Sequence, residues 1–175
     1  MRRPLTLILL LALVLSAACR SSNENEAAAN KNQAAKPDPE MRDPEGRTAL
    51  MRTLADGDTD RARKMIEDGA DVNARMNSGV SVLQTAAGMG HVELTKLLIA
   101  KGADVNSRTG GNFTALMNAA MTGQKEIVQI LLDAGADPSI KDNSGRTAAM
   151  YAAEQKHIEV SELLRAKTGE RAPAR

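Results

Sequence analysis

The sequence has almost no aromatic residues: it holds one Phe, one Tyr and no Trp among 175 residues. Aromatic side chains supply much of the buried area of thick globular cores. Their shortage disfavours such a core, although 42% of the residues are hydrophobic. The core must then be built from Leu, Ile, Val, Met and Ala side chains, a composition that suits thin layers of stacked helices.

Cysteine and an excess of charge are also missing. A single Cys excludes an internal disulfide and a zinc site made of thiolates. The 23 basic and 22 acidic residues nearly cancel, and loss of Arg2 and Arg3 with a leader would change the formal net charge from +1 to −1. Nucleic-acid binding requires a basic face that displaces phosphate counterions, so we expect no nucleic-acid partner.

The N-terminal residues have the pattern of a secretory signal peptide. Arg2 and Arg3 form a positive start, an almost unbroken apolar run extends over residues 5–18, and residues 16–18 are small. The run is short for a membrane span, which needs roughly 20 residues. We therefore predict a signal peptide over residues 1–18, and an uncleaved anchor is the weaker alternative.

The end of the apolar run resembles a bacterial lipoprotein box, with the sequence Leu15-Ser16-Ala17-Ala18-Cys19. The resemblance implies that the Cys19 thiol receives a diacylglyceryl group and that cleavage leaves Cys19 as the acylated first residue. Acyl chains, at ~0.8 kcal/mol per buried CH₂, would then hold the protein at a membrane on the periplasmic side. Ser16 and Ala18 also fit an ordinary signal peptidase, so a soluble periplasmic protein is the alternative.

Residues 19–42 have no apolar periodicity. After Cys19 they consist mainly of Ser, Asn, Glu, Ala, Lys, Gln and Pro. This composition cannot bury enough apolar surface to offset the entropy of ordering. We predict a disordered linker over residues 19–42 and a flexible tail over residues 168–175.

Internal repetition is the strongest signal in the sequence. Four similar segments begin at residues 48, 81, 114 and 147, a step of 33: Thr48-Ala49-Leu50-Met51, Ser81-Val82-Leu83-Gln84, Thr114-Ala115-Leu116-Met117 and Thr147-Ala148-Ala149-Met150. A Gly-Ala-Asp triplet beginning at residues 69, 102 and 135 keeps the same step. Each unit is too thin to bury its own apolar face, so its stability must come from stacking on its neighbours.

These motifs resemble the ankyrin repeat, with its 33-residue unit and T-P-L-H-x-A signature. The resemblance implies an all-α repeat solenoid whose repeats are helix-turn-helix units, each with a β-turn finger. We assign the repeat domain to residues 43–167, with four repeats at about 43–75, 76–108, 109–141 and 142–167. The signature Pro and His are replaced throughout, for example by Ala115 and Met117, so the usual histidine hydrogen bonds between repeats are not expected there.

The repeats also predict where the helices begin and end. The predicted N-caps, whose hydroxyls can accept free backbone N–H groups, are Thr48, Ser81, Thr114 and Thr147. Gly90 and Gly123 end the first helix of their repeats, because glycine tolerates the left-handed conformation of a C-cap. Lys156 stands at this place in repeat four, and other departures there and in repeat one indicate the two ends of the stack.

The sequence offers no convincing catalytic centre. His91 and His157 lie two repeats apart, which is too far for one metal ion, and we interpret both as residues that cap and pack. The glycine-rich segments 88–91 and 110–112 lack the Gly-Lys-Ser/Thr ending of a phosphate loop. We therefore predict a protein that is not an enzyme, with no catalytic residue, no metal and no cofactor.

The resemblance also implies a contact surface, because the fingers and first helices of ankyrin proteins form a concave face that binds partners. Carried over position by position, the predicted contact residues are Arg75, Met76, Asn77, Val80, Met89, Arg108, Phe113, Met121, Lys141 and Arg146. Their apolar members would form a centre and their cations a rim, as in many protein interfaces. The alternative is that some of the methionines pack inward.

The sequence therefore predicts a monomeric, non-enzymatic protein-protein interaction module, a scaffold or an inhibitor, attached to a membrane of a bacterial cell envelope through Cys19. Its partner would be a protein with an exposed acidic or apolar loop. The alternative is a soluble periplasmic protein whose groove binds a small ligand or has an unrecognised enzymatic role. That alternative would require a pocket with converging polar groups.

Overall fold

The computed structural model describes residues 41–169. The predicted signal peptide, Cys19, the linker up to residue 40 and the tail from residue 170 lie outside the described residues. The described part contains eight α-helices: α2 (Ala49–Ala55), α3 (Thr59–Glu67), α4 (Val82–Met89), α5 (Val92–Ala100), α6 (Ala115–Met121), α7 (Lys125–Asp133), α8 (Ala148–Glu154) and α9 (Ile158–Thr168).

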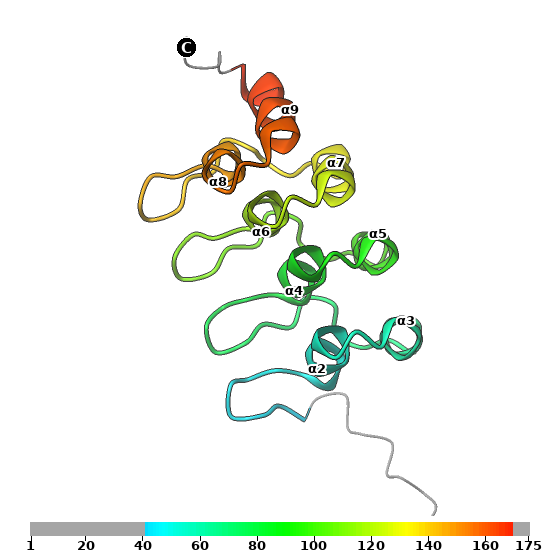
Figure 1. Ribbon diagram of the computed structural model, residues 1–175. Helices are drawn as coiled ribbons and strands as arrows, with labels where there is room; N and C mark the ends of the chain where they lie inside the picture. Colours follow the sequence, from blue (N-terminus) through cyan, green and yellow to red (C-terminus); the bar gives the residue numbers. More distant parts are fainter. Residues whose placement is uncertain (1–40, 170–175) are drawn as a thin grey trace, which may run out of the picture. The chain divides into compact units, whose positions relative to one another are not determined.

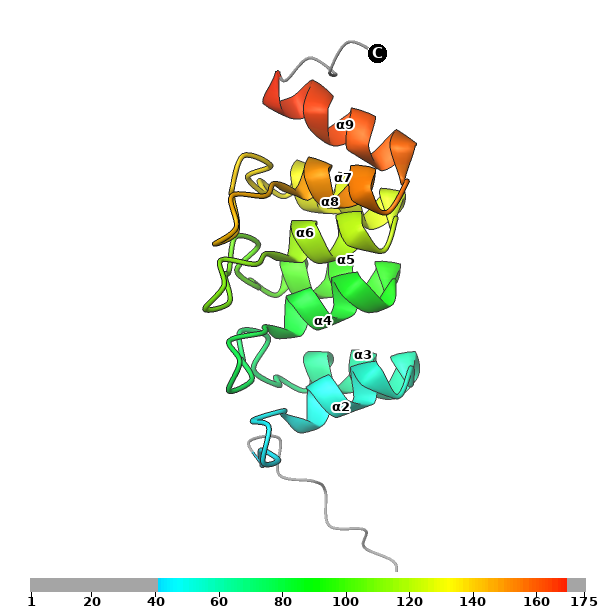
Figure 2. The ribbon, with the colours of Figure 1, turned by 60° about the vertical axis from the view of Figure 1, so that its left-hand side comes forward.

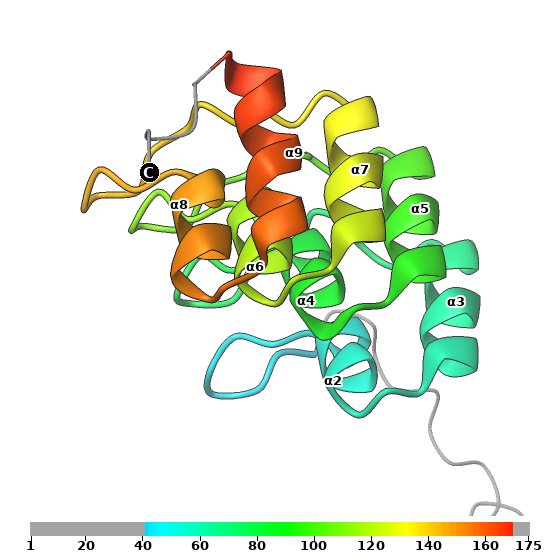
Figure 3. The same cartoon turned by 45° about the horizontal axis from the view of Figure 1, so that its top comes forward.

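The helices lie in two rows (Figure 1). The first row holds α2, α4, α6 and α8, the second row holds α3, α5, α7 and α9, and each helix contacts the next one of its row. A hairpin precedes every first-row helix and projects from that row (Figures 1 and 2). Figure 3 shows the two rows from a second direction. This arrangement confirms the predicted all-α repeat solenoid.

Three of the predicted N-caps close their helices as expected. The hydroxyls of Thr48, Ser81 and Thr114 each accept the backbone N–H three residues later, at 3.3, 3.2 and 3.3 Å. Thr147 is the N-cap of α8 as predicted, but the expected capping bond is missing, because its buried hydroxyl has no hydrogen-bond partner within residues 41–169. The Met150 N–H donates instead to the Thr147 backbone carbonyl at 3.1 Å, so α8 begins with a tighter turn.

Glycine ends the first helix of the inner repeats, and repeat four departs from this rule. Gly90 is the left-handed C-cap of α4, and Gly123 follows the C-cap of α6 with a φ of 73°. Lys156 occupies the same place with a φ of 64°. A residue with a side chain is strained in this conformation by about 1 kcal/mol. The backbone of repeat four is therefore strained at Lys156, whereas glycine avoids this strain in the inner repeats.

The core lies between the rows and between successive repeats. Leucines and methionines fill it, and the alanine pairs Ala86-Ala87 of α4 and Ala119-Ala120 of α6 are completely buried. Gln84, at the position of the signature His, donates from Nε2 to the backbone carbonyls of Ser107 at 3.3 Å and Phe113 at 2.6 Å. Through its bond to Phe113, a different side chain thus connects repeats two and three where no histidine is present.

Arg42 and Thr168 lie just outside the bounds assigned to the repeat domain and take part in its structure. Arg42, which the sequence assigned to the linker, donates from Nη1 to the Arg75 carbonyl at 2.6 Å. It does so because it occupies the repeat position of Arg75, which makes the same bond to the Arg108 carbonyl at 2.9 Å. At the other end, α9 continues to Thr168.

Candidate functional site

The structure has four hairpins, which we number one to four over residues 42–48, 75–81, 108–114 and 141–147. Hydrogen bonds connect their tips in two pairs, one with two and three with four. The Asn77 backbone N–H donates to the Glu45 carbonyl at 3.0 Å, and its Nδ2 donates to the Pro44 carbonyl at 2.9 Å. Asn143 makes the same two bonds to hairpin three, at 3.0 and 3.2 Å. Gly110 occupies this position in hairpin three and has no side chain. Asn77, a predicted contact residue, is therefore exposed but already bonded to its neighbour.

Some cations of the predicted positive rim already bond to other residues of the protein. Arg75 donates to the Arg108 carbonyl, and its Nη2 lies 3.8 Å from Oδ2 of Asp104. Arg108 and Lys141 are exposed. The pKa of Asp137 is lowered, first by hydrogen bonds from Ser139 and then by the charge of Arg108. Arg108 and Lys141 are thus more available to a partner than Arg75.

The end hairpins, one and four, each contain an internal ion pair. Arg47 Nε lies 2.7 Å from Oδ2 of Asp43, and Arg146 Nη2 lies 3.4 Å from Oδ2 of Asp142. The two pairs occupy identical repeat positions, three repeats apart. The corresponding residues of the middle hairpins carry no charge: they are Met76 and Val80 in hairpin two, and Thr109 and Phe113 in hairpin three. At these two positions the middle hairpins therefore carry uncharged side chains, whereas an ion pair holds each end hairpin together.

Hairpin four is anchored on Tyr151, the one Tyr of the chain. The Tyr151 hydroxyl donates to Oδ2 of Asp142 at 2.5 Å, which lowers the pKa of Asp142. Burial, and then this hydrogen bond, raise the pKa of Tyr151 to about 12. The Arg146 guanidinium lies 4.3 Å from the Tyr151 ring centroid, and the Phe113 ring meets the same ring edge-on at 5.0 Å. The structure thus brings together two predicted contact residues, Phe113 and Arg146, in a cluster that also joins repeats three and four.

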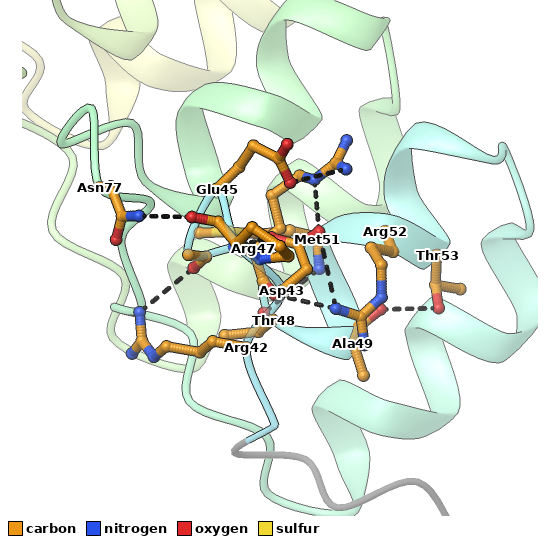
Figure 4. A network of polar contacts seen from close by, with 12 residues as sticks. Arg42, Asp43, Glu45, Arg47, Thr48, Ala49, Met51, Arg52, Thr53 and Asn77 are labelled. Carbon is orange, nitrogen blue, oxygen red and sulfur yellow. Dashed lines mark hydrogen bonds and ion pairs between the residues drawn. The ribbon is translucent and has the colours of Figure 1, made fainter.

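Hairpin one is closed by the network drawn in Figure 4. Burial opposes ionisation of Asp43, but hydrogen bonds from the Arg47 backbone and side chain outweigh it and hold the pKa of Asp43 below its ordinary value. Arg52 adds a second cation, with Nη1 3.8 Å from Oδ2 of Asp43. The Asp43 carboxylate is therefore already bonded within the protein. One of its cationic partners, Arg47, remains partly exposed.

The predicted apolar centre divides into two groups. Met76, Val80 and Phe113 lie in the middle hairpins and are half-buried. Met89 and Met121 end α4 and α6 and are 51% and 36% exposed. An eight-residue helix such as α4 places its last residue about 12 Å along its axis from the hairpin. The inward-packing alternative holds in part for Met76, which packs against the core.

A cavity of about 410 Å³ lies between hairpins one and two. It is lined by Glu45, Arg47, Met76, Asn77 and Ser78. Met76 and Asn77 are predicted contact residues, whereas Glu45 and Arg47 are not among the predicted ones. The step of 33 residues could have indicated Arg47, because it relates Arg47 to the predicted contact residue Val80.

The histidines lie at contacts between repeats. His91 Nε2 lies 2.9 Å from the Leu54 carbonyl, so its N–H donates from repeat two to repeat one. His157 borders a second cavity of about 380 Å³, beside Lys125, which is paired with Glu159 at 2.8 Å. Within residues 41–169, no three His, Cys, Asp or Glu side chains are grouped so that they could hold a metal ion.

The comparisons with known proteins agree with this geometry. A family model described as ankyrin repeats in three copies matches residues 15–109 and 107–172. No curated protein matches the sequence. None of the helices within residues 41–169 has both the length and the apolar character needed to cross a membrane.

Proposed function

The chain belongs to the ankyrin-repeat family, whose repeats are generally protein-protein interaction modules, and we propose that it binds one protein partner through its hairpins and first-row helices. In this proposal the protein is a non-enzymatic scaffold or inhibitor. The contact surface is centred on repeats two and three and includes the exposed ends of α4 and α6.

The observation that carries the proposal is that the middle repeats expose methionines and have no Asp–Arg pair in their hairpins. Met89 and Met121 are exposed at the ends of neighbouring helices, and hairpins two and three lack the Asp–Arg pairs of the end hairpins. Exposed apolar side chains that gather in one region of a folded protein mark interaction sites. Methionine adapts to the shape of a partner because its side chain is flexible and polarizable.

Cations flank this region and define the charge of the partner. Arg108 and Lys141 are exposed on hairpins three and four. Cations at the rim of an interface accelerate association with an acidic partner and reject basic ones. We therefore propose a partner with an acidic or apolar loop, and we expect association to slow as salt concentration rises.

The proposed location is the periplasmic side of a bacterial cell envelope, with a lipid on Cys19. The support is the order of the sequence alone: a positive start, an apolar run and a Cys directly after it. Cells grown with radiolabelled palmitate should label the protein, and Cys19→Ser should lose the label and leave the membrane fraction. Membrane attachment that persists in the unlabelled variant would contradict lipidation.

Partner binding is tested by chemical crosslinking in an envelope fraction, purification of the protein and identification of the adduct by mass spectrometry. The double variant Met89→Glu, Met121→Glu should reduce the adduct at least tenfold, because it places two charges in the proposed apolar contact. Met150→Glu is the matched control, since Met150 is 45% exposed on α8, outside the middle repeats.

Equal adduct yields from the double variant and the control would contradict the proposed surface. Phe113 is unsuitable for this test because its ring packs on Tyr151. A substitution there would change stability together with binding.

A further inference from the structure

We infer that the tips of hairpins two and three bind a carboxamide of the partner, the side chain of an Asn or a Gln, between them. We call the space between two neighbouring hairpin tips a seam. The carbonyls of Asn77 and Ser78 lie on one side of this seam, and the backbone N–H of Gly110 lies on the other. The inference rests on the proposed function, because the carboxamide belongs to the same protein partner.

The other two seams show what this one lacks. In the seam between hairpins one and two, the Asn77 backbone N–H donates to the Glu45 carbonyl and the Asn77 carboxamide donates to the Pro44 carbonyl. Asn143 makes the same two bonds in the seam between hairpins three and four. The residue at this position in hairpin three is Gly110, which has no carboxamide to donate.

The backbone groups of the middle seam are consequently unpaired. The carbonyls of Asn77 and Ser78 correspond to the two that accept in each of the other seams, yet neither accepts a hydrogen bond within residues 41–169. The Gly110 N–H donates none there either. A ligand that displaces water from such groups must supply matching donors and acceptors to gain affinity.

The middle seam is narrow but more open than the first. A Cβ on Gly46 would lie 2.8 Å from the Asn77 backbone nitrogen, whereas a Cβ on Gly79, the corresponding residue, would lie 3.4 Å from that of Gly110. Gly46 is buried and Gly79 is only partly buried. A Cβ on Gly110 would meet nothing within 4 Å, so the place where Asn77 and Asn143 put their side chains is open here.

The donors and acceptors of the seam select the occupant. A carboxamide has two N–H donors and one carbonyl oxygen, which match the two carbonyls and the one N–H of the seam. A carboxylate has no donor for the two carbonyls. A cation has donors but no acceptor for the Gly110 N–H. An Asn or Gln side chain therefore fits the seam, as Asn77 and Asn143 fit the other two.

The seam also lies within the proposed contact surface. Hairpins two and three follow one another along the first row (Figures 1 and 2). Met76 belongs to hairpin two, Phe113 to hairpin three, and the exposed Arg108 begins hairpin three. A partner loop bound to the middle repeats thus passes beside the seam, where one directional polar contact complements the apolar ones.

The test uses the full chain in detergent micelles, labelled with ¹⁵N and followed by NMR. The probe is N-acetyl-asparagine N-methylamide. The Gly110 N–H signal reports one side of the seam, and the Gly79 N–H signal reports the other, because it belongs to the same peptide unit as the Ser78 carbonyl. We expect both signals to shift with saturation. The corresponding aspartate and alanine compounds, which lack the carboxamide, should cause shifts smaller by about fivefold or more.

A matched pair of variants links the shift to the seam. Gly110→Asn places a carboxamide of the chain itself in the seam and should abolish the Gly79 shift. Gly145→Asn places the same side chain on the exposed tip of hairpin four and should leave the shift unchanged. Both positions have open space for a Cβ, and the residue corresponding to Gly145 in hairpin three is Asn112, with a similar φ of 59°. In the crosslinking experiment, only Gly110→Asn should reduce the partner adduct, by about fivefold or more.

Several outcomes would overturn the inference. They are equal shifts from the three compounds, a Gly79 shift that survives Gly110→Asn, and a full partner adduct from Gly110→Asn. An equally large shift of Gly145 would also overturn it, since no hairpin among the described residues faces the Ser144 carbonyl from beyond hairpin four.

The two proposals fail separately. Absence of a Gly79 shift, together with an adduct that is lost in the Met89 and Met121 double variant, would overturn the seam and support the proposed function. An adduct that the double variant keeps would contradict the proposed surface, whatever the probe does at Gly79.

Discussion

The end hairpins and the middle hairpins share one backbone pattern but close it differently. Hairpins one and four use an Asp–Arg pair, Asp43 with Arg47 and Asp142 with Arg146. Hairpins two and three carry uncharged residues at these positions. In hairpin three the Thr109 hydroxyl accepts the Phe113 N–H, and Gln84 of the preceding repeat donates to the Phe113 carbonyl. An end hairpin has only one neighbouring repeat among the described residues. The comparison indicates that internal ion pairs stabilise the ends of the stack, which leaves the middle hairpins free to carry apolar contact residues.

The largest effect should come from the aromatic anchor of hairpin four. Tyr151→Ala should destabilise the domain by about 3–5 kcal/mol, because it removes a buried ring that touches Phe113, Asp142 and Arg146. Thr85→Ala, at the same position of repeat two, should cost about 1 kcal/mol or less. Urea unfolding measures both values. Equal losses would remove the proposed difference between the end and middle repeats.

Acid should weaken the end hairpins selectively. The pKa values of Asp43 and Asp142 are lowered in the folded state, so their contribution is present above about pH 4 and is lost as the pH falls through the folded values. The urea midpoint of the parent should therefore fall between pH 5 and pH 2. The double variant Asp43→Asn, Asp142→Asn should begin with a lower midpoint and lose less of it, and a slope equal to that of the parent would argue against this role.

A substitution in the turn between α8 and α9 should change the stability by a smaller amount and in the opposite direction. Lys156→Gly should stabilise the domain by about 1 kcal/mol, because it relieves a left-handed conformation that carries a side chain. Gly123→Ala, at the same position of repeat three, should destabilise it, since a Cβ there would meet the His157 ring. Thermal unfolding of the two variants gives the comparison, and the same sign of change in both would be inconsistent with it.

The smallest effect concerns the gap between the middle hairpins. Gly110→Asn would supply the side chain that Asn77 and Asn143 use to connect their hairpins, and it has open space for a Cβ. One added hydrogen bond should raise stability by about 0.5–1 kcal/mol. An unchanged urea midpoint would show that hairpins two and three do not approach closely enough for this bond.

The step of 33 residues made most of the fold predictable. It located the three N-caps whose hydroxyls accept a backbone hydrogen bond, the turn glycines and the ends of the stack. Each of these features depends on residues within one repeat. Contacts that depend on how neighbouring repeats meet were not predictable in this way. The packing of Phe113 on Tyr151 and the walls of the cavity at Glu45 and Arg47 are set by the spacing between hairpins, which a repeat period does not specify. The Thr147 hydroxyl, which has no hydrogen-bond partner within the described residues, likewise reflects the tighter first turn of α8.

The most direct test of the central claim, that the middle repeats bind a protein partner, is photo-crosslinking from single positions in living cells. A photoreactive amino acid would replace Met89, Met121, Met150 or Glu93 in turn; Glu93 lies exposed on the second row. The account predicts one and the same protein adduct from Met89 and Met121 and none from Met150 or Glu93. Adducts from Glu93 or Met150 alone would contradict it.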